Sequence, residues 1–92
     1  MNAKVEDNIY NKISKTIIRK LYTSKCFGKG HMLTGRFKSS LPSHMLGDVD
    51  SVLKDLMKKE IILPYGMTKY GFAVYLNIKK LDEIEKILEN KE

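Results

Sequence analysis

The segment from residue 43 to residue 77 constrains the fold most, because the spacing of its apolar residues changes from helical to strand-like. Across residues 48–59 the apolar positions recur every three or four residues, which is typical of a helix with one buried face. A β-branched run, 61–63, then ends at Pro64, and a second apolar run follows at 72–76. The pattern predicts a helix that leads directly into two antiparallel strands joined by a turn.

The flanking segments predict further helices, and together with the two strands they indicate an α+β fold. Residues 5–25 carry an apolar residue every three or four positions and are expected to form a first helix. A short second helix is expected at 34–40, with Phe37 as its core anchor, and a proline break separates it from the next helix. The last helix is expected at Ile78–Asn90, and Asn77 is a suitable residue to cap its start.

The region between the first and second helices is rich in glycine. Gly28 and Gly30 are expected to end the first helix, because glycine reaches the left-handed conformation that a helix C-terminus needs. Residues 31–33 are expected to form a short strand that pairs with the other two. Although the two glycines flank a lysine, no strand is predicted before them and no GKS or GKT sequence follows, so a nucleotide-binding loop is not inferred.

Positive charge is concentrated in one half of the chain. The 92 residues fit one domain, 1–92, with 1–5 and 90–92 expected to be frayed ends. The net charge is +6, and residues 8–47 hold eight lysines and arginines but no aspartate or glutamate. A field of one sign attracts polyanions, and the solvated surface of a basic protein gives the same pattern.

Composition and cysteine content argue against several classes of protein. The sequence has no apolar stretch long enough to span a membrane and no secretory leader, so a cytoplasmic protein is expected. The single cysteine, Cys26, cannot form a disulfide within the chain. The spacing of Cys26, His31 and His44 matches no zinc pattern, and a glycine-rich loop is a poor support for a Cys26–His31 catalytic pair. We therefore expect no enzyme, no metal site and no cofactor.

The chain from about residue 28 to residue 88 resembles the small stand-alone winged helix-turn-helix proteins of archaeal type. The residues that carry the resemblance are Gly30 and His31 in the loop, Leu41, Pro42 and His44 before the third helix, Lys69, Tyr70 and Gly71 in the turn, and Leu76 and Asn77 after it. The resemblance implies a three-helix core, an antiparallel wing of two or three strands, and an additional C-terminal helix. For function it implies binding to nucleic acid.

The resemblance and the placement of the basic residues together favour a nucleic-acid-binding protein, one that binds double-stranded DNA and regulates transcription. The third helix is expected in the major groove, and the wing at 64–71 on the neighbouring backbone. Basic residues before the third helix are expected on phosphates, and polar residues within it near base edges. The candidate binding residues are Lys29, His31, Arg36, Lys38, His44, Ser51, Lys54, Lys58, Lys69 and Tyr70.

Three aspartates and the tyrosines of the wing keep other functions open. Asp48, Asp50 and Asp55 lie in or beside the third helix, where a carboxylate repels a phosphate backbone. They favour, as one alternative, a protein–protein interaction module that does not bind DNA. Exposed tyrosines can stack on unpaired bases, so an RNA-binding module is a further alternative. The apolar stripe of the last helix either packs on the first helix or forms a homodimer.

Overall fold

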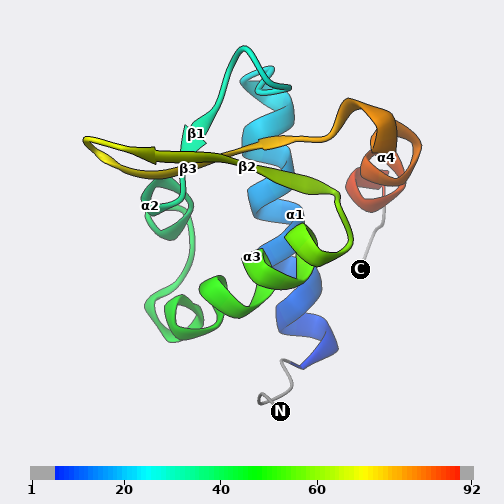
Figure 1. Cartoon of the computed structure of the whole chain (residues 1–92). Coiled ribbons are helices and arrows are strands. Elements are labelled where there is room, and N and C mark those ends of the chain that lie inside the picture. The colour runs from blue at the N-terminus through cyan, green and yellow to red at the C-terminus, as the bar shows by residue number, and fades with distance from the viewer. Residues whose placement is uncertain (1–5, 90–92) are drawn as a thin grey trace.

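The computed structural model describes residues 6–89, and Figure 1 shows how the elements are arranged. In chain order they are α1 (Asp7–Thr23), β1 (Met32–Leu33), α2 (Gly35–Lys38), the 3-10 helix η1 (Ser43–Asp48), α3 (Val49–Lys58), β2 (Ile62–Thr68), β3 (Gly71–Leu76), the 3-10 helix η2 (Ile78–Lys80) and α4 (Leu81–Glu89). The sheet lies across α1, with α3 below it and α4 at the end away from the β2–β3 turn (Figure 1). Helices around a three-stranded antiparallel sheet confirm the prediction of an α+β fold.

The sheet has the strand order β1-β3-β2, and both pairs of strands are antiparallel. The prediction that Pro64 ends its strand is wrong, since β2 continues to Thr68. β2 lies at the edge of the sheet, where proline is tolerated, and a bulge between Pro64 and Gly66 accommodates the irregularity. The expected turn at 64–71 therefore narrows to residues 68–71, and the hairpin projects well beyond the helices (Figure 1).

The helices bury their apolar stripes in one core. The stripe predicted on the first helix is confirmed, because Ile13, Ile17 and Leu21 are all fully buried. Phe37 of α2 is also fully buried and anchors that short helix, as predicted. The buried side chains of α3 are Val49, Val52, Leu53 and Leu56. This packing fixes which side of α3 faces outward.

Both α1 and α3 end at a left-handed residue that is not glycine. Lys25 after α1 has a φ of 57°, and Glu60 after α3 has a φ of 62°. In both places this residue and the next one donate backbone N–H groups to carbonyls of the last helical turn, which is the pattern of a Schellman motif. The prediction that Gly28 and Gly30 end the first helix is therefore wrong, because Lys25 ends it first.

The last helix folds back onto the rest of the chain. The predicted helix from Ile78 begins as the 3-10 helix η2 and continues as α4 from Leu81. Asn77 caps η2, because its side-chain oxygen accepts a hydrogen bond from the backbone N–H of Lys79 at 3.1 Å. Ile84 is fully buried, and Ile87 and Leu88 pack against the core. Contacts between α4 and α1 show that the chain itself covers this apolar stripe. A homodimer through α4 stays a prediction, and it would have to use the other side chains of the helix.

Residue 90, the predicted end of that helix, lies outside the described residues, as do the segments 1–5 and 90–92 that were expected to fray. Among the helices of residues 6–89, none combines the length and the apolar character needed to cross a membrane.

Candidate nucleic-acid interface

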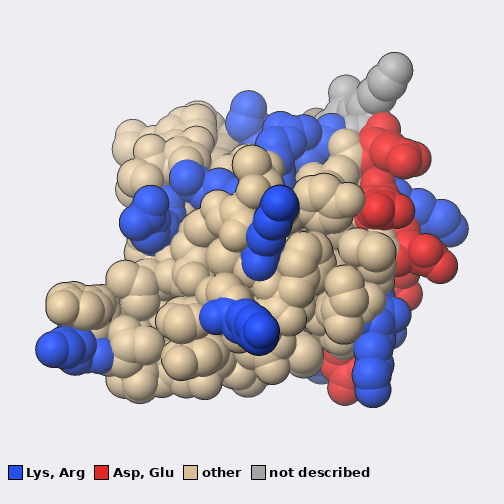
Figure 2. All heavy atoms as spheres, turned by 90° about the horizontal axis from the view of Figure 1, so that it is seen from above, with Lys and Arg blue, Asp and Glu red and all other residues tan. Residues whose placement is uncertain are grey.

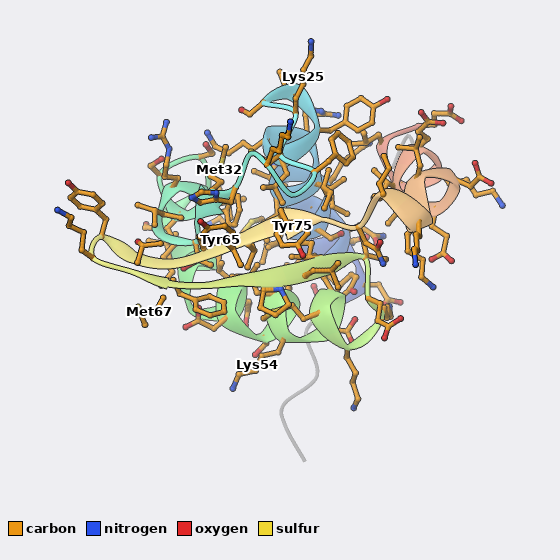
Figure 3. The ribbon with its side chains drawn as sticks, turned by 45° about the horizontal axis from the view of Figure 1, so that its top comes forward. Lys25, Met32, Lys54, Tyr65, Met67 and Tyr75 are labelled. Carbon is orange, nitrogen blue, oxygen red and sulfur yellow. The ribbon has the colours of Figure 1, made fainter. Side chains whose placement is uncertain are left out.

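The outward side of α3 carries three of the predicted binding residues. Ser51, Lys54 and Lys58 are exposed and recur at helical spacing, so they lie in one row along the helix. The opposite side of α3 is buried in the core, which holds this row in place. Together with Asp55 the three residues border an open hollow of about 460 Å³. Lys54 points away from the body of the molecule (Figure 3).

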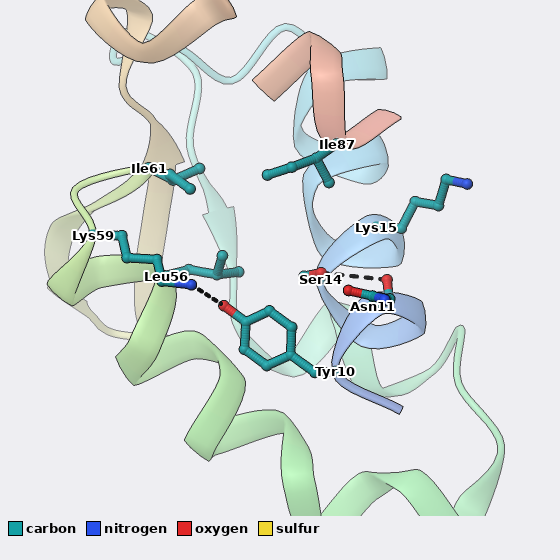
Figure 4. A pocket seen from close by; sticks show the side chains of 8 residues that line it. All are labelled: Tyr10, Asn11, Ser14, Lys15, Leu56, Lys59, Ile61 and Ile87. Atoms are coloured by element: carbon teal, nitrogen blue, oxygen red, sulfur yellow. Dashed lines mark hydrogen bonds between the residues drawn. The ribbon is translucent and has the colours of Figure 1, made fainter. Parts of the chain in front are cut away.

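Asp55, the strongest objection to phosphate binding, is engaged in bonds within the chain. The Tyr10 hydroxyl donates a hydrogen bond to the Asp55 carboxylate, and the Lys59 ammonium lies 3.1 Å from the same oxygen. Lys59 also donates to the Tyr10 oxygen at 3.2 Å (Figure 4). The bond from Tyr10 holds the pKa of Asp55 below its ordinary value. The carboxylate is therefore charged, but the adjacent ammonium offsets its charge and the cluster ties α3 to α1.

Asp50 is also paired, although more weakly. Its carboxylate lies 4.0 Å from the ammonium of Lys38, and the two side chains are 74% and 44% exposed. An exposed pair at this distance contributes at most about 1 kcal/mol. Asp50 lies in the first turn of α3, where a negative charge interacts favourably with the helix dipole. Lys38, which was expected on a phosphate, therefore lies beside the start of α3, where it forms a weak ion pair with Asp50.

The turn between β2 and β3 is braced by side-chain bonds. The Thr68 hydroxyl accepts a hydrogen bond from the Tyr70 N–H at 3.1 Å and donates to the Gly71 carbonyl at 2.7 Å. Gly71 has a φ of 131°, a backbone conformation that glycine adopts without strain. The Lys69 ammonium lies 5.6 Å from the centroid of the Tyr70 ring, within the range of a cation–π contact. The tip of the hairpin therefore presents one cation and one aromatic ring, and Tyr70 is 76% exposed.

Four predicted residues from separate segments meet around a second hollow. His31, Arg36, Lys69 and Tyr70 line an open space of about 620 Å³ between β1, α2 and the hairpin tip. The ring of His31 stacks on that of Tyr65, with the two centroids 3.7 Å apart and the planes at 10°. One face of the imidazole is therefore covered. This hollow and the row on α3 have no lining residue in common.

Three predicted residues join neither group, and one of them is Lys38, which pairs with Asp50. Lys29 lies in the segment between α1 and β1, which passes above the sheet while α3 lies below it (Figure 1). His44 is exposed on η1, before α3 begins. Figure 2 shows basic side chains spread over the upper face, with most of the acidic side chains gathered toward the end that carries α4. The basic residues thus do not converge on α3 alone.

A small cleft between α1, α3 and α4 holds polar groups that are already bonded (Figure 4). Its volume is about 160 Å³. Inside it the Ser14 hydroxyl donates to the carbonyl of Asn11 at 3.3 Å. Burial is the main cause that raises the pKa of the Tyr10 phenol, and the hydrogen bond to Asp55 raises it further. The phenol therefore stays protonated at neutral pH and continues to donate its hydrogen bond.

The cysteine has the environment of a core residue. Cys26 is buried, and burial raises the pKa of its thiol. A raised pKa leaves the thiol protonated at neutral pH, whereas a nucleophilic cysteine needs a lowered one. Within residues 6–89, no group of three or more histidine, cysteine, aspartate or glutamate side chains is arranged to hold a metal ion.

The sequence indicates only one of the contacts in the cluster of Tyr10, Asp55 and Lys59. Asp55 and Lys59 are four residues apart on one helix, a spacing that favours an ion pair. The third member, Tyr10, lies 45 residues away from Asp55, and no local pattern links the two. The sequence therefore predicts no contact between Tyr10 and Asp55.

Comparison of the chain with models of protein families, with curated proteins and with solved structures finds no match. The resemblance to the winged helix-turn-helix proteins therefore stays a prediction.

Proposed function

We propose that this chain is a winged helix-turn-helix protein that binds double-stranded DNA through α3. The order of elements supports the proposal: helix, strand, two helices and a β-hairpin, with the first strand paired to the last one. In proteins of this type a helix packed beneath the sheet enters the major groove. The hairpin then corresponds to the wing.

The single observation that carries the proposal is the outward row of α3. Lys54 and Lys58 present ammonium groups for phosphates, and Ser51 presents a hydroxyl that can meet a base edge. Asp55 lies beside this row, but Tyr10 and Lys59 satisfy its carboxylate. An α-helix with its side chains is about 10–12 Å in diameter, so α3 fits a major groove about 12 Å wide.

The hairpin supplies a second contact with the duplex. The bonds of Thr68 constrain the backbone of the turn, so little backbone entropy is lost when Lys69 meets a phosphate. Arg36 and Lys38 lie on α2, which precedes α3 in the chain, and they can supply further phosphate contacts. To reach DNA, Lys38 must give up its weak pair with Asp50.

A titration with duplex DNA tests the proposal. With four or five phosphates neutralised, log affinity should fall against log salt with a slope of roughly −4. The double variant Lys54→Ala/Lys58→Ala should bind more weakly and reduce the slope by about 2. The matched control is Lys12→Ala/Lys86→Ala, which removes the same charge from exposed positions on α1 and α4. If both double variants lose affinity and slope equally, α3 is not the binding surface.

A protein-interaction module is the second candidate, and the exposed carboxylate of Asp50 is the observation that favours it. On a DNA-binding helix, Asp50→Asn removes a repulsive charge and should strengthen duplex binding. On a helix that docks on a basic partner, the same substitution should weaken capture of that partner. A wild-type protein with a flat salt response toward duplex DNA would favour this second function.

A further inference from the structure

The hollow between β1, α2 and the hairpin tip combines two kinds of group that recognise a nucleotide. Arg36 and Lys69 supply cations, and His31 and Tyr70 supply aromatic rings. No aspartate or glutamate of the described residues is among those that line it. Its volume of about 620 Å³ lies within the range of about 300–1,000 Å³ that is usual for small-molecule sites.

We propose that this hollow binds one unpaired nucleotide, with its phosphate on Arg36 and Lys69 and its base stacked on the ring of His31. Guanidinium groups bind phosphate through paired N–H donors, and an ammonium adds a point charge. The stack with Tyr65 supports the imidazole on one face, so the proposal places the base on the opposite face.

The chemistry favours an unpaired base over a duplex. Inside a duplex both faces of a base are covered by its neighbours, so an aromatic side chain can stack only on a base that has left the helix. The row on α3 provides no aromatic ring, whereas this hollow is lined by two. The two surfaces therefore suit different forms of nucleic acid.

The hollow should show little preference among bases. The proposal places Arg36 and Lys69 on the phosphate, and the lining contains no asparagine, glutamine, aspartate or glutamate to read the edge of a base. The Ser24 hydroxyl is one small polar group of the lining that could contact a base edge. The Thr68 hydroxyl is already occupied by the bonds of the turn. Stacking on a ring is possible for every base, so binding should tolerate all four.

The inference does not rest on duplex binding by α3, since Arg36 and His31 line this hollow and take no part in the α3 row. The test is the anisotropy of a labelled single strand of about ten deoxythymidines, a length within the usual site size for such binding. Arg36→Gln and His31→Ala should each weaken binding by about tenfold. The control Lys54→Ala/Lys58→Ala should bind this strand as wild type does while losing duplex affinity.

Competition identifies the source of the nucleotide. Displacement of the labelled strand by thymidine monophosphate shows that a free nucleotide suffices, and displacement by unlabelled strand alone shows that neighbouring nucleotides are needed. Inorganic phosphate at the same concentration should displace far less than either, because it offers nothing to stack. Equal displacement by phosphate, or unchanged affinity in both Arg36→Gln and His31→Ala, would overturn the proposal. If Lys54→Ala/Lys58→Ala loses single-strand binding instead, the strand binds to α3 and the proposal for the hollow is wrong. That result would not argue against duplex binding by α3.

Discussion

Replacing Asp55 with asparagine should lower the free energy of unfolding, because the carboxylate joins α1 to the last turn of α3. It accepts the hydrogen bond from the Tyr10 hydroxyl and lies 3.1 Å from the Lys59 ammonium. A hydrogen bond to a charged group contributes about 1.5–3 kcal/mol when it is shielded from water. The Asp55 side chain is 39% exposed, so solvent screening reduces this contribution.

We therefore expect Asp55→Asn to cost about 1.5 kcal/mol and Tyr10→Phe to cost about 1 kcal/mol. For a domain of this size, about 1.5 kcal/mol corresponds to a fall of about 6–12 °C in Tm. Urea denaturation followed by circular dichroism measures both losses. The control is Asp50→Asn, whose exposed pair with Lys38 at 4.0 Å should change stability by less than about 0.5 kcal/mol.

The double variant Tyr10→Phe/Asp55→Asn separates the bond itself from other effects of the two substitutions. If the two side chains interact as the structure shows, the losses should fall short of additivity by about 1 kcal/mol. If the losses in the free energy of unfolding add to within about 0.3 kcal/mol, Tyr10 and Asp55 stabilise the fold independently. The predicted interaction between the two side chains would then be wrong.

Three further predictions concern pH, the helix ends and the last helix. The pKa of Asp55 is lowered in the folded chain, so its contribution to the free energy of unfolding is complete above about pH 4 and is lost as the pH falls through the lowered value. Urea titrations at acidic pH should show this loss in wild type and less of it in Asp55→Asn. The pKa of Tyr10 is raised, so its contribution is present below about pH 10 and is lost as the pH rises through the raised value, which the same titrations at alkaline pH measure. Lys25→Gly and Glu60→Gly should each stabilise the chain by about 0.5–1 kcal/mol in thermal denaturation, because glycine adopts a positive φ without strain. Ile84→Ala should cost about 2–5 kcal/mol in urea, whereas a loss below about 1 kcal/mol would mean that α4 does not pack in the core.

The helices and strands of this chain were predictable where the pattern of apolar residues was regular. The stripe of the first helix and the anchor Phe37 were identified correctly. A helix with one buried face needs an apolar residue every three or four positions, and this spacing is visible in the sequence of the first helix. The extent of β2 was missed, because only the order of the strands shows that Pro64 lies on an edge strand. The end of α1 was misplaced, because Lys25 adopts a conformation for which glycine is the usual sequence signal.

The candidate site was less predictable than the fold. A run of basic residues shows that charge is present, but it does not show which faces the charges occupy. The segment that carries Lys29 lies on the opposite side of the sheet from α3 (Figure 1). Lys69 and Arg36 line the same hollow, although they are far apart in the sequence. The role of Asp55 depends on Tyr10 from another helix. Such relations arise from tertiary packing, and the sequence carries no local signal for them.

The most direct test of duplex binding by α3 is a titration of isotope-labelled protein with a duplex of about 15 base pairs, followed by amide chemical shifts in NMR spectra. If α3 binds the duplex, the largest shift changes should fall in residues 49–58 and 68–71, with small changes in α4 and in residues 24–31. Unchanged shifts in residues 49–58 while the duplex binds would contradict binding through α3. So would the largest changes in residues 24–31, on the opposite side of the sheet.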